Sequence, residues 1–350
     1  MELLTIFMLS LLGLLQMNDT TEVVFAGDAM QHGRQIKAAQ RADGSFDYTD
    51  CFTLLESDIK KADFAVVNLE CPLGGAPYQG YPLFSCPDEF AKQLQTSGFD
   101  LLLTANNHCM DSGKKGAQRT VTTLDGMGVA HIGVYQDTAQ RSKRVPYVTD
   151  VNGIKMAFLT YTYGTNGLTV KEPLVVDLID EKVMATDIKK ARAEGAEMVC
   201  VCMHWGNEYE KLPSKRQREL AEMMRSEGVD MIIGSHPHVV QPMEMNYAEN
   251  AGAGHAVVYS LGNFISNQND LDSRGGAMAT VTIARYEDRP VILGVKPTLL
   301  FCQKSVGKKD NYMLIPQNQY AKVREDSKST FEQFMSNAMK LFEKYNKNIE

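Results

Sequence analysis

Short apolar runs alternate with stretches of helical spacing along most of the chain, and this alternation constrains the fold more than any other feature of the sequence. Gly, Asn or Asp bounds each apolar run, a pattern that is typical of buried strands. Alternating strands and helices predict a layered α/β fold. The predicted strands cover residues 23–27, 64–68, 101–105, 198–204, 231–234 and 257–261, and the predicted helices cover residues 87–97, 114–127, 181–194 and 214–227.

A second group of apolar runs follows a different pattern, because no helical stretch separates its members. We expect these runs to form a mixed sheet, and two sheets to pack face to face. The runs cover residues 145–149, 154–161, 278–285 and 291–299.

The organisation predicted along the chain is one large domain, residues 21–300, between two smaller segments. Residues 301–350 form a C-terminal extension that includes a helix. The apolar residues of this helix recur at helical spacing, which favours docking on the domain rather than binding of a partner. They are Phe331, Phe334, Met335, Ala338 and Phe342.

The N-terminal segment, residues 1–20, is ambiguous. Its apolar run, residues 3–17, has no Lys or Arg before it and no cleavage signal after it. As a helix it would measure about 22 Å, less than the roughly 30 Å of a bilayer core. We expect either a degraded signal or short anchor, which places the protein in the cell envelope, or an apolar helix packed on the domain of a cytoplasmic protein.

Charge and cysteine content exclude several classes of protein. The chain has 36 basic and 43 acidic residues, a formal charge of −7, which argues against nucleic acid as a partner. Its seven cysteines are scattered and odd in number, unlike a disulfide framework or a zinc knuckle. Cys200 and Cys202 would share one face of a strand, where we interpret them as small core residues.

Polar side chains cluster just past the carboxyl ends of five predicted strands. Ligands of open α/β sheets bind in the crevice at this edge. Carboxylate, amide oxygen and imidazole together suit a borderline divalent ion, so we predict a site for one or two ions of Mn, Fe or Zn. The predicted ligands are Asp28, Glu70, Asn107, His204, His236 and His238.

Two local patterns refine this prediction. Pro237 favours an extended backbone at His236, which would point His236 and His238 the same way. His108 precedes Asp111 by three residues, so a helical turn would let the carboxylate orient the imidazole. The alternatives are a surface histidine at position 108 and, for Asp28, a simple turn after a strand.

Six segments in order resemble the bacterial capsule synthesis protein CapA, or poly-γ-glutamate capsule, family. They are residues 24–28 (VFAGD), 68–70 (NLE), 105–108 (ANNH, followed by Asp111 and Gly113), 204–209 (HWGNEY), 234–241 (GSHPHVVQ) and 259–264 (YSLGNF). The resemblance implies kinship with calcineurin-like metallophosphoesterases, which are four-layer α-β-β-α sandwiches of two mixed sheets that bind two metals.

The resemblance also implies roles for single residues. Asp28 and His238 would hold the first metal, and Glu70 would stand where a carboxylate usually bridges the two metals. His108 would be the acid beside the leaving group. The second metal would be held by Asn107, His204 and His236.

Three positions depart from the metallophosphoesterase pattern. Met30 stands where a histidine usually follows the first aspartate, and a thioether is a poor ligand for a hard ion. Glu70 replaces the usual bridging aspartate, and Asn106 replaces a glycine. A related fold does not transfer phosphatase activity.

The function predicted first is a metal-dependent hydrolase or transferase that acts in biosynthesis of a poly-γ-glutamate-type capsule polymer. Its substrate would be an anionic polymer or a phosphoester. The alternatives are a non-catalytic platform for polymer or membrane synthase subunits, and a soluble phosphoesterase.

Loops 74–84 and 163–173 are rich in Gly, Pro and Tyr, which suits either a stacking surface or plain surface loops. Residues expected to support the ligands or contact substrate are Asn68, Asn106, Glu208 and Asn263.

Overall fold

The computed structural model describes residues 20–246, 254–307 and 310–349. The apolar run at residues 3–17 lies outside the described residues. Among the helices that are described, none is long and apolar enough to cross a membrane.

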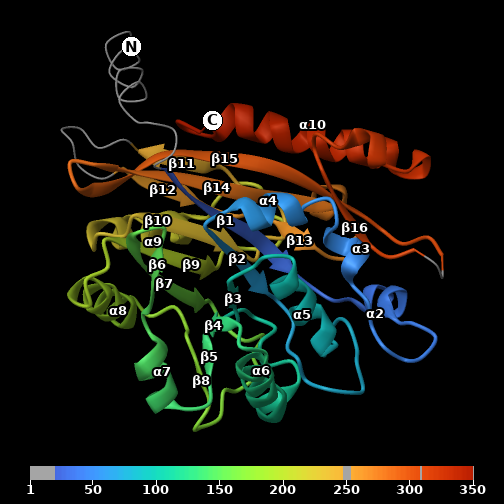
Figure 1. The fold of residues 1–350 in the computed structure, drawn as a ribbon, viewed down its shortest axis with the longest axis horizontal. Coiled ribbons are helices and arrows are strands. Elements are labelled where there is room, and N and C mark those ends of the chain that lie inside the picture. The colour runs from blue at the N-terminus through green and yellow to red at the C-terminus, as the bar shows by residue number, and fades with distance from the viewer. Residues whose placement is uncertain (1–19, 247–253, 308–309, 350) are drawn as a thin grey trace.

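The first sheet has eight strands and is mixed (Figure 1). In spatial order its strands are β16 (Met313–Pro316), β15 (Arg289–Gln303), β14 (Gly275–Tyr286), β1 (Thr20–Ala29), β2 (Phe64–Leu69), β3 (Leu101–Leu103) and β4 (Ala130–Ile132), with β13 (Asn263–Ile265) beside β1. Strands β1 to β4 run parallel, β13 also pairs in parallel with β1, and β14 to β16 continue the sheet in antiparallel fashion.

The second sheet has six strands and is also mixed. Its four central strands are parallel, and an antiparallel strand closes each edge. Its order is β11 (Met243–Asn246), β12 (His255–Val258), β10 (Met231–Ser235), β9 (Met198–His204), β7 (Ile154–Thr162) and β6 (Tyr147–Val151), and a separate pair joins β5 (Val134–Tyr135) to β8 (Val175–Val176).

The expectation that the helix-free strands form one mixed sheet of their own was wrong. The β6–β7 hairpin joins the second sheet through β9, whereas the β14–β15 hairpin joins the first sheet through β1. Each hairpin therefore extends a parallel sheet with antiparallel strands, and both sheets become mixed.

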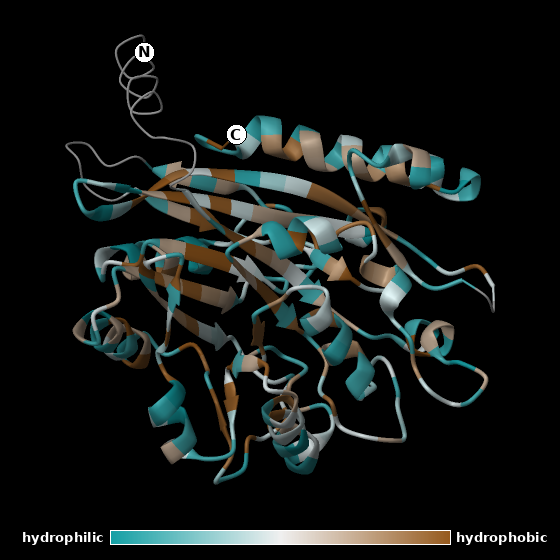
Figure 2. Cartoon of the chain, in the orientation of Figure 1, coloured by the Kyte–Doolittle hydropathy of each residue, from teal (hydrophilic) through white to brown (hydrophobic). Residues whose placement is uncertain are grey.

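Alternation along the strands builds three hydrophobic layers. Val23 and Phe25 point into the core between the sheets, whereas Val24 and Ala26 point to the helices outside. Helices α3 (Thr49–Phe52), α4 (Glu56–Lys61), α5 (Asp88–Thr96) and α6 (Gly113–Met127) contribute to the outer layer of the first sheet, and α8 (Glu181–Ala193) and α9 (Lys215–Ser226) cover the second. This confirms the α-β-β-α sandwich, and Figure 2 shows hydrophobic residues concentrated in its strands.

Local sequence explains where several helices begin. The Asp180 carboxylate accepts from the N–H groups of Lys182 and Val183 at the start of α8. Ser214 and Gln217 form a reciprocal capping box at the start of α9. Such caps are each worth about 1 kcal/mol. The remaining helical segments are α2 (Gly33–Ala39), α7 (Thr138–Arg144), η1 (Leu271–Ser273), η2 (Tyr320–Lys322) and η3 (Glu325–Ser327).

The C-terminal helix α10 (Lys328–Tyr345) lies along β15 (Figure 1). Phe331 and Phe334 pack against Phe301 with ring centroids 5.5 and 6.3 Å away. This confirms the predicted docking face, of which Phe331, Phe334, Met335 and Ala338 are buried and Phe342 is partly buried.

The cysteines behave as core residues. All seven are buried and free. The sulfur atoms of Cys200 and Cys202 lie 4.0 Å apart on the inner face of β9, which confirms their interpretation as small apolar residues.

Candidate metal centre

Polar side chains from both sheets meet at the carboxyl ends of the parallel strands. The first sheet contributes from the ends of β1, β2 and β3, and the second from the ends of β9 and β10. Each of these polar side chains is buried, whereas the strands around them bury almost only apolar residues. The residues brought together are Asp28, Glu70, Asn107, His204, His236 and His238.

Asp28 ends β1 and is completely buried. Its Oδ1 accepts from the Asn68 amide at 2.7 Å, and its Oδ2 accepts from the backbone N–H of His236 at 3.2 Å. The Nδ1 atom of His238 lies 3.3 Å from Oδ2. Burial alone would raise the pKa of Asp28, but His238 and Asn68 hold this pKa well below its usual value. Asp28 is therefore an anion in the folded protein.

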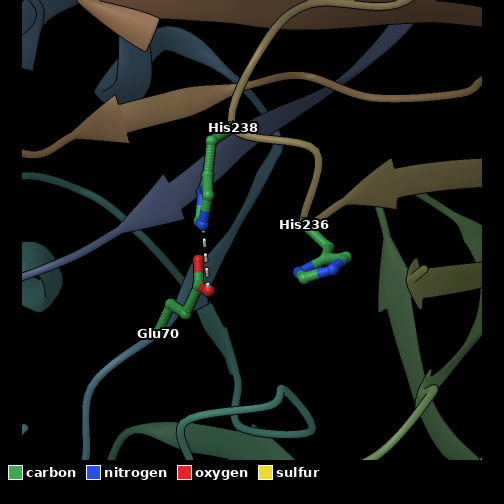
Figure 3. Close-up of side chains that lie close together, drawn as sticks. All are labelled: Glu70, His236 and His238. Atoms are coloured by element: carbon green, nitrogen blue, oxygen red, sulfur yellow. Dashed lines mark ion pairs between the residues drawn. The ribbon is translucent and has the colours of Figure 1, made fainter. Parts of the chain in front are cut away.

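Glu70 follows β2 and is also completely buried, yet neither of its carboxylate oxygens has a hydrogen-bond partner among the residues that the structure describes. Its Oε1 lies 3.5 Å from Nε2 of His204. The same oxygen lies 3.9 Å from Nε2 of His238 (Figure 3). Burial and the charge of Asp28 raise the pKa of Glu70 well above its usual value. A buried carboxylate without donors is costly, and a cation between these groups would remove that cost.

The donor atoms fall into two groups that share one residue. Glu70, His236 and His238 form one group, and Asp28, Glu70 and His204 form the other, with the ligand atoms of each within 4.8 Å of one another. Burial and the neighbouring imidazoles lower the pKa of His204, and they lower the pKa of His236 to about 3. These imidazoles are therefore neutral at pH 7, the form that binds metals. This donor set fits one divalent ion, or two with Glu70 between them.

The backbone at His236 and His238 differs from the expected extended form. His236 has φ of +97° and His238 has φ of +58°. The reason is that β10 ends at Ser235 and the chain turns at once, which lets the N–H of His236 reach Asp28. Left-handed backbone at residues other than glycine costs about 1 kcal/mol or more. Both rings still face the site, with centroids 5.9 Å apart.

Amide side chains surround the imidazoles. Nε2 of His204 lies 2.9 Å from Oδ1 of Asn107, and its Nδ1 lies 3.2 Å from the Asn68 amide. Nδ1 of His238 lies 3.1 Å from Oδ1 of Asn263. Asn106 in turn donates to the side chain of Asn68 and to the backbone of Leu69. These contacts fix the orientation of the rings.

His108 and Asp111 form a pair beside the cluster. Nδ1 of His108 lies 2.7 Å from Oδ2 of Asp111, and the N–H of Asp111 donates to the His108 carbonyl at 3.0 Å. The turn predicted from the spacing of these residues is thus present. The Phe84 N–H donates to the same carboxylate oxygen, and the Phe84 ring meets His108 edge-on at 4.7 Å. Glu208, by contrast, lies exposed at the surface.

Two tyrosines not among the predicted site residues lie over the cluster. The ring of Tyr163 lies 4.5 Å from that of His236, and the ring of Tyr209 lies 6.1 Å from that of His238. Both tyrosines are about half exposed. Tyr163 directly follows β7, which pairs with β9 so that Thr162 stands beside His204. Strand order was the missing signal, because the sequence does not reveal that these two strands are neighbours.

Comparison with known proteins agrees with the family resemblance. The bacterial capsule synthesis protein PGA_cap family matches residues 22–268. The PGA biosynthesis protein CapA of Bacillus subtilis is 29% identical over 289 residues, which are 78% of this chain and 72% of that protein. The capsule biosynthesis protein CapA of Bacillus anthracis is 29% identical over 272 residues, which are 75% of this chain but only 63% of that protein.

Among solved structures, calcineurin-like phosphoesterase YfkN from Bacillus subtilis is similar, with 14% sequence identity and a TM-score of 0.49 over 92% of this chain and 98% of that chain. The family match covers most of the chain and all six candidate ligands. The chain therefore belongs to the bacterial capsule synthesis protein PGA_cap family.

Proposed function

We propose that this protein is a divalent-metal-dependent hydrolase or transferase in the biosynthesis of a poly-γ-glutamate-type capsule polymer. The observation that carries the proposal is the Glu70 carboxylate, which is buried without a donor among three imidazoles and Asp28. The proposal is also supported by the membership of the chain in a capsule synthesis family. Since capsules are assembled at the cell surface, the proposed place of action is the cell envelope.

The proposed ligands are Asp28 and Glu70 with the imidazoles of His204, His236 and His238, and the amide oxygen of Asn107 completes the set. Mixed carboxylate and imidazole donors suit Mn, Fe or Zn. When bound, such an ion polarises a phosphoryl or acyl oxygen and makes water more acidic.

His108 is the proposed proton donor to the leaving group. The Asp111 carboxylate holds Nδ1 of this ring at 2.7 Å, which leaves Nε2 as the atom that exchanges a proton with substrate. Phe84 packs against the ring and limits its rotation. The rings of Tyr163 and Tyr209 reduce the access of water to the imidazoles from the solvent side.

Metal content of the purified protein tests the proposal. The wild type should contain manganese, iron or zinc in near-stoichiometric amount, and a His236→Ala, His238→Ala double variant should contain none. His255→Ala is the matched control, because His255 is a partly buried histidine that contacts Asn246 outside the cluster. Full metal content in the double variant would refute the proposed site.

A second candidate is a non-catalytic assembly protein that binds polymer or membrane synthase subunits. It is favoured by Met30, which is buried in the apolar layer where a metallophosphoesterase usually has a metal-binding histidine. A metal-loaded protein that cleaves or transfers neither γ-glutamyl amides nor phosphoesters, but co-purifies with a membrane synthase, would select this candidate over the enzyme.

A further inference from the structure

Three cationic side chains gather a few side chains away from the candidate metal centre. Arg34 is exposed on α2, Arg274 is partly buried after η1, and Lys304 is partly buried after β15. In the part of the chain that the structure describes, none of the three has a carboxylate within ion-pair distance, whereas the neighbouring Arg324 is paired with Asp310 at 3.2 Å. We call Arg34, Arg274 and Lys304 the cationic cluster.

Lys304 of the cationic cluster is connected to the His108–Asp111 pair through a chain of contacts. The backbone carbonyl of Asn267 accepts from Nζ of Lys304 at 2.9 Å, and its N–H donates to Nδ1 of His32 at 3.3 Å. The ring of His32 meets Phe84 edge-on at 5.2 Å, and Phe84 packs on His108. The cluster therefore lies a few side chains from the point where substrate would react.

Two of these cations, Lys304 and Arg274, are held in place by the protein, whereas Arg34 is exposed to solvent. Nζ of Lys304 also donates to Oδ1 of Asn269 at 2.7 Å. The guanidinium of Arg274 lies 5.1 Å from the centre of the Phe301 ring, and its buried Nε has no hydrogen-bond partner among the described residues. A surface lysine or arginine that serves only solubility would be mobile and fully hydrated. A buried donor without a partner costs free energy, so the described residues do not fully satisfy this guanidinium.

The like charges also repel one another. Burial lowers the pKa of Lys304 to about 8, and the charges of Arg274 and Arg34 add to this effect. The whole chain carries a formal charge of −7, so this local excess of positive charge is not a general property of the protein. A bound anion would remove the repulsion.

We infer that the cationic cluster is an anion subsite, which binds free carboxylates of an acidic polymer while a neighbouring unit of the same polymer lies at the metal centre. A γ-linked glutamate chain carries one free carboxylate per unit, and planar guanidinium groups bind carboxylates through paired hydrogen bonds. The inference rests on the proposed function for the identity of the polymer, but not for the existence of the subsite.

Binding of a fluorescent γ-linked glutamate oligomer to metal-loaded protein at about 50 mM salt tests the inference, since low salt preserves surface electrostatics. An Arg34→Gln, Lys304→Gln double variant should bind at least about tenfold more weakly than wild type, because charge-assisted hydrogen bonds are among the stronger polar contacts. Lys37→Gln is the matched control: it removes one charge from the same helix α2 at an exposed position, and affinity should change less than about twofold.

Three further measurements separate the outcomes. Thermal unfolding shows that the variants fold, and their metal content should equal that of wild type. Inorganic polyphosphate serves as a competitor that carries phosphate in place of carboxylate. Equal binding by wild type and the double variant, an equal loss in Lys37→Gln, or binding of polyphosphate but not of the glutamate oligomer would each overturn the inference. If the wild type neither contains nor takes up metal, but its binding of the oligomer depends on Arg34 and Lys304, the subsite would be supported and the proposed metal chemistry refuted.

Discussion

Oδ2 of Asp111 lies 2.7 Å from Nδ1 of His108, and both side chains are buried. This contact fixes which ring nitrogen faces the carboxylate and leaves the other for substrate. Asp111→Asn keeps an acceptor for the Phe84 N–H but loses the charge that holds the imidazole. We expect turnover to fall about 100-fold, in line with the usual contribution of a general acid.

The measurement for Asp111→Asn is kcat and KM in metal-loaded protein, beside metal content. A role in orienting His108 predicts that kcat falls while KM and metal content stay the same. A variant that loses its metal, or that keeps the wild-type kcat at reduced stability, would show that Asp111 is only structural.

Metal removal should destabilise the wild type. A ligand at 100 times its Kd stabilises the folded state by about 2.7 kcal/mol, so a chelator should lower Tm by about 5 °C or more. Glu70→Gln removes the buried carboxylate that has no donor. We expect the chelator to leave the Tm of this variant unchanged, and the metal-free variant to unfold at a higher temperature than metal-free wild type. Differential scanning calorimetry with and without chelator checks both expectations.

Tyr163 should slow the loss of metal, because its ring lies 4.5 Å from that of His236 on the solvent side of the site. Tyr163→Ala should release metal to a chelator at least about tenfold faster than wild type. Tyr163→Phe keeps the ring and should match wild type. Stopped-flow detection of the released ion compares the rates of metal loss. Equally fast release from Tyr163→Ala and Tyr163→Phe would assign the effect to the hydroxyl group instead of the ring.

The lowered pKa of Lys304 predicts how polymer binding changes with pH. Burial, Arg274 and Arg34 lower the pKa of Lys304 to about 8 in the free protein, and the nearby Cys302 opposes this shift. The ammonium group is charged at pH 7 and loses its proton as pH rises through 8, so affinity for the glutamate oligomer should fall above pH 8. A Lys304→Gln variant should lack this decrease between pH 7 and 9. Titrations of both proteins by isothermal calorimetry test the difference.

The C-terminal helix should contribute strongly to stability. Phe334 is buried against Phe301, so Phe334→Ala should lower the free energy of unfolding by about 3–5 kcal/mol. Met339 on the same helix is 52% exposed, and Met339→Ala should change the free energy of unfolding by less than about 0.5 kcal/mol. Urea denaturation of both variants gives the values. Equal effects would mean that the helix does not stabilise the core through this face.

The sequence predicted the positions of the main strands because a buried strand needs a continuous apolar run, and it predicted the edge at which the polar residues gather. It could not predict the partners of the strands. The hairpins β6–β7 and β14–β15 have the same apolar pattern, yet they join different sheets, because pairing depends on neighbours that are distant in sequence.

The candidate site was predictable in its residue types but not in its backbone. The proline at 237 suggested an extended His236, whereas the tertiary hydrogen bond to Asp28 favours a left-handed one. The sequence alone also did not identify Tyr163 or the cationic cluster, because both depend on tertiary contacts. Their significance comes from which loops lie side by side, and spacing along the chain does not encode it.

The candidate ligands come from two sheets that share no strand. Asp28 lies in β1 and Glu70 directly follows β2 of the first sheet, whereas His204 ends β9 and His236 directly follows β10 of the second. A metal held by all four residues would link the two sheets. The affinity of the protein for that metal would then depend on how the two sheets are aligned. Neither sheet alone supplies all the candidate ligands, so loss of the alignment between the sheets would weaken the site.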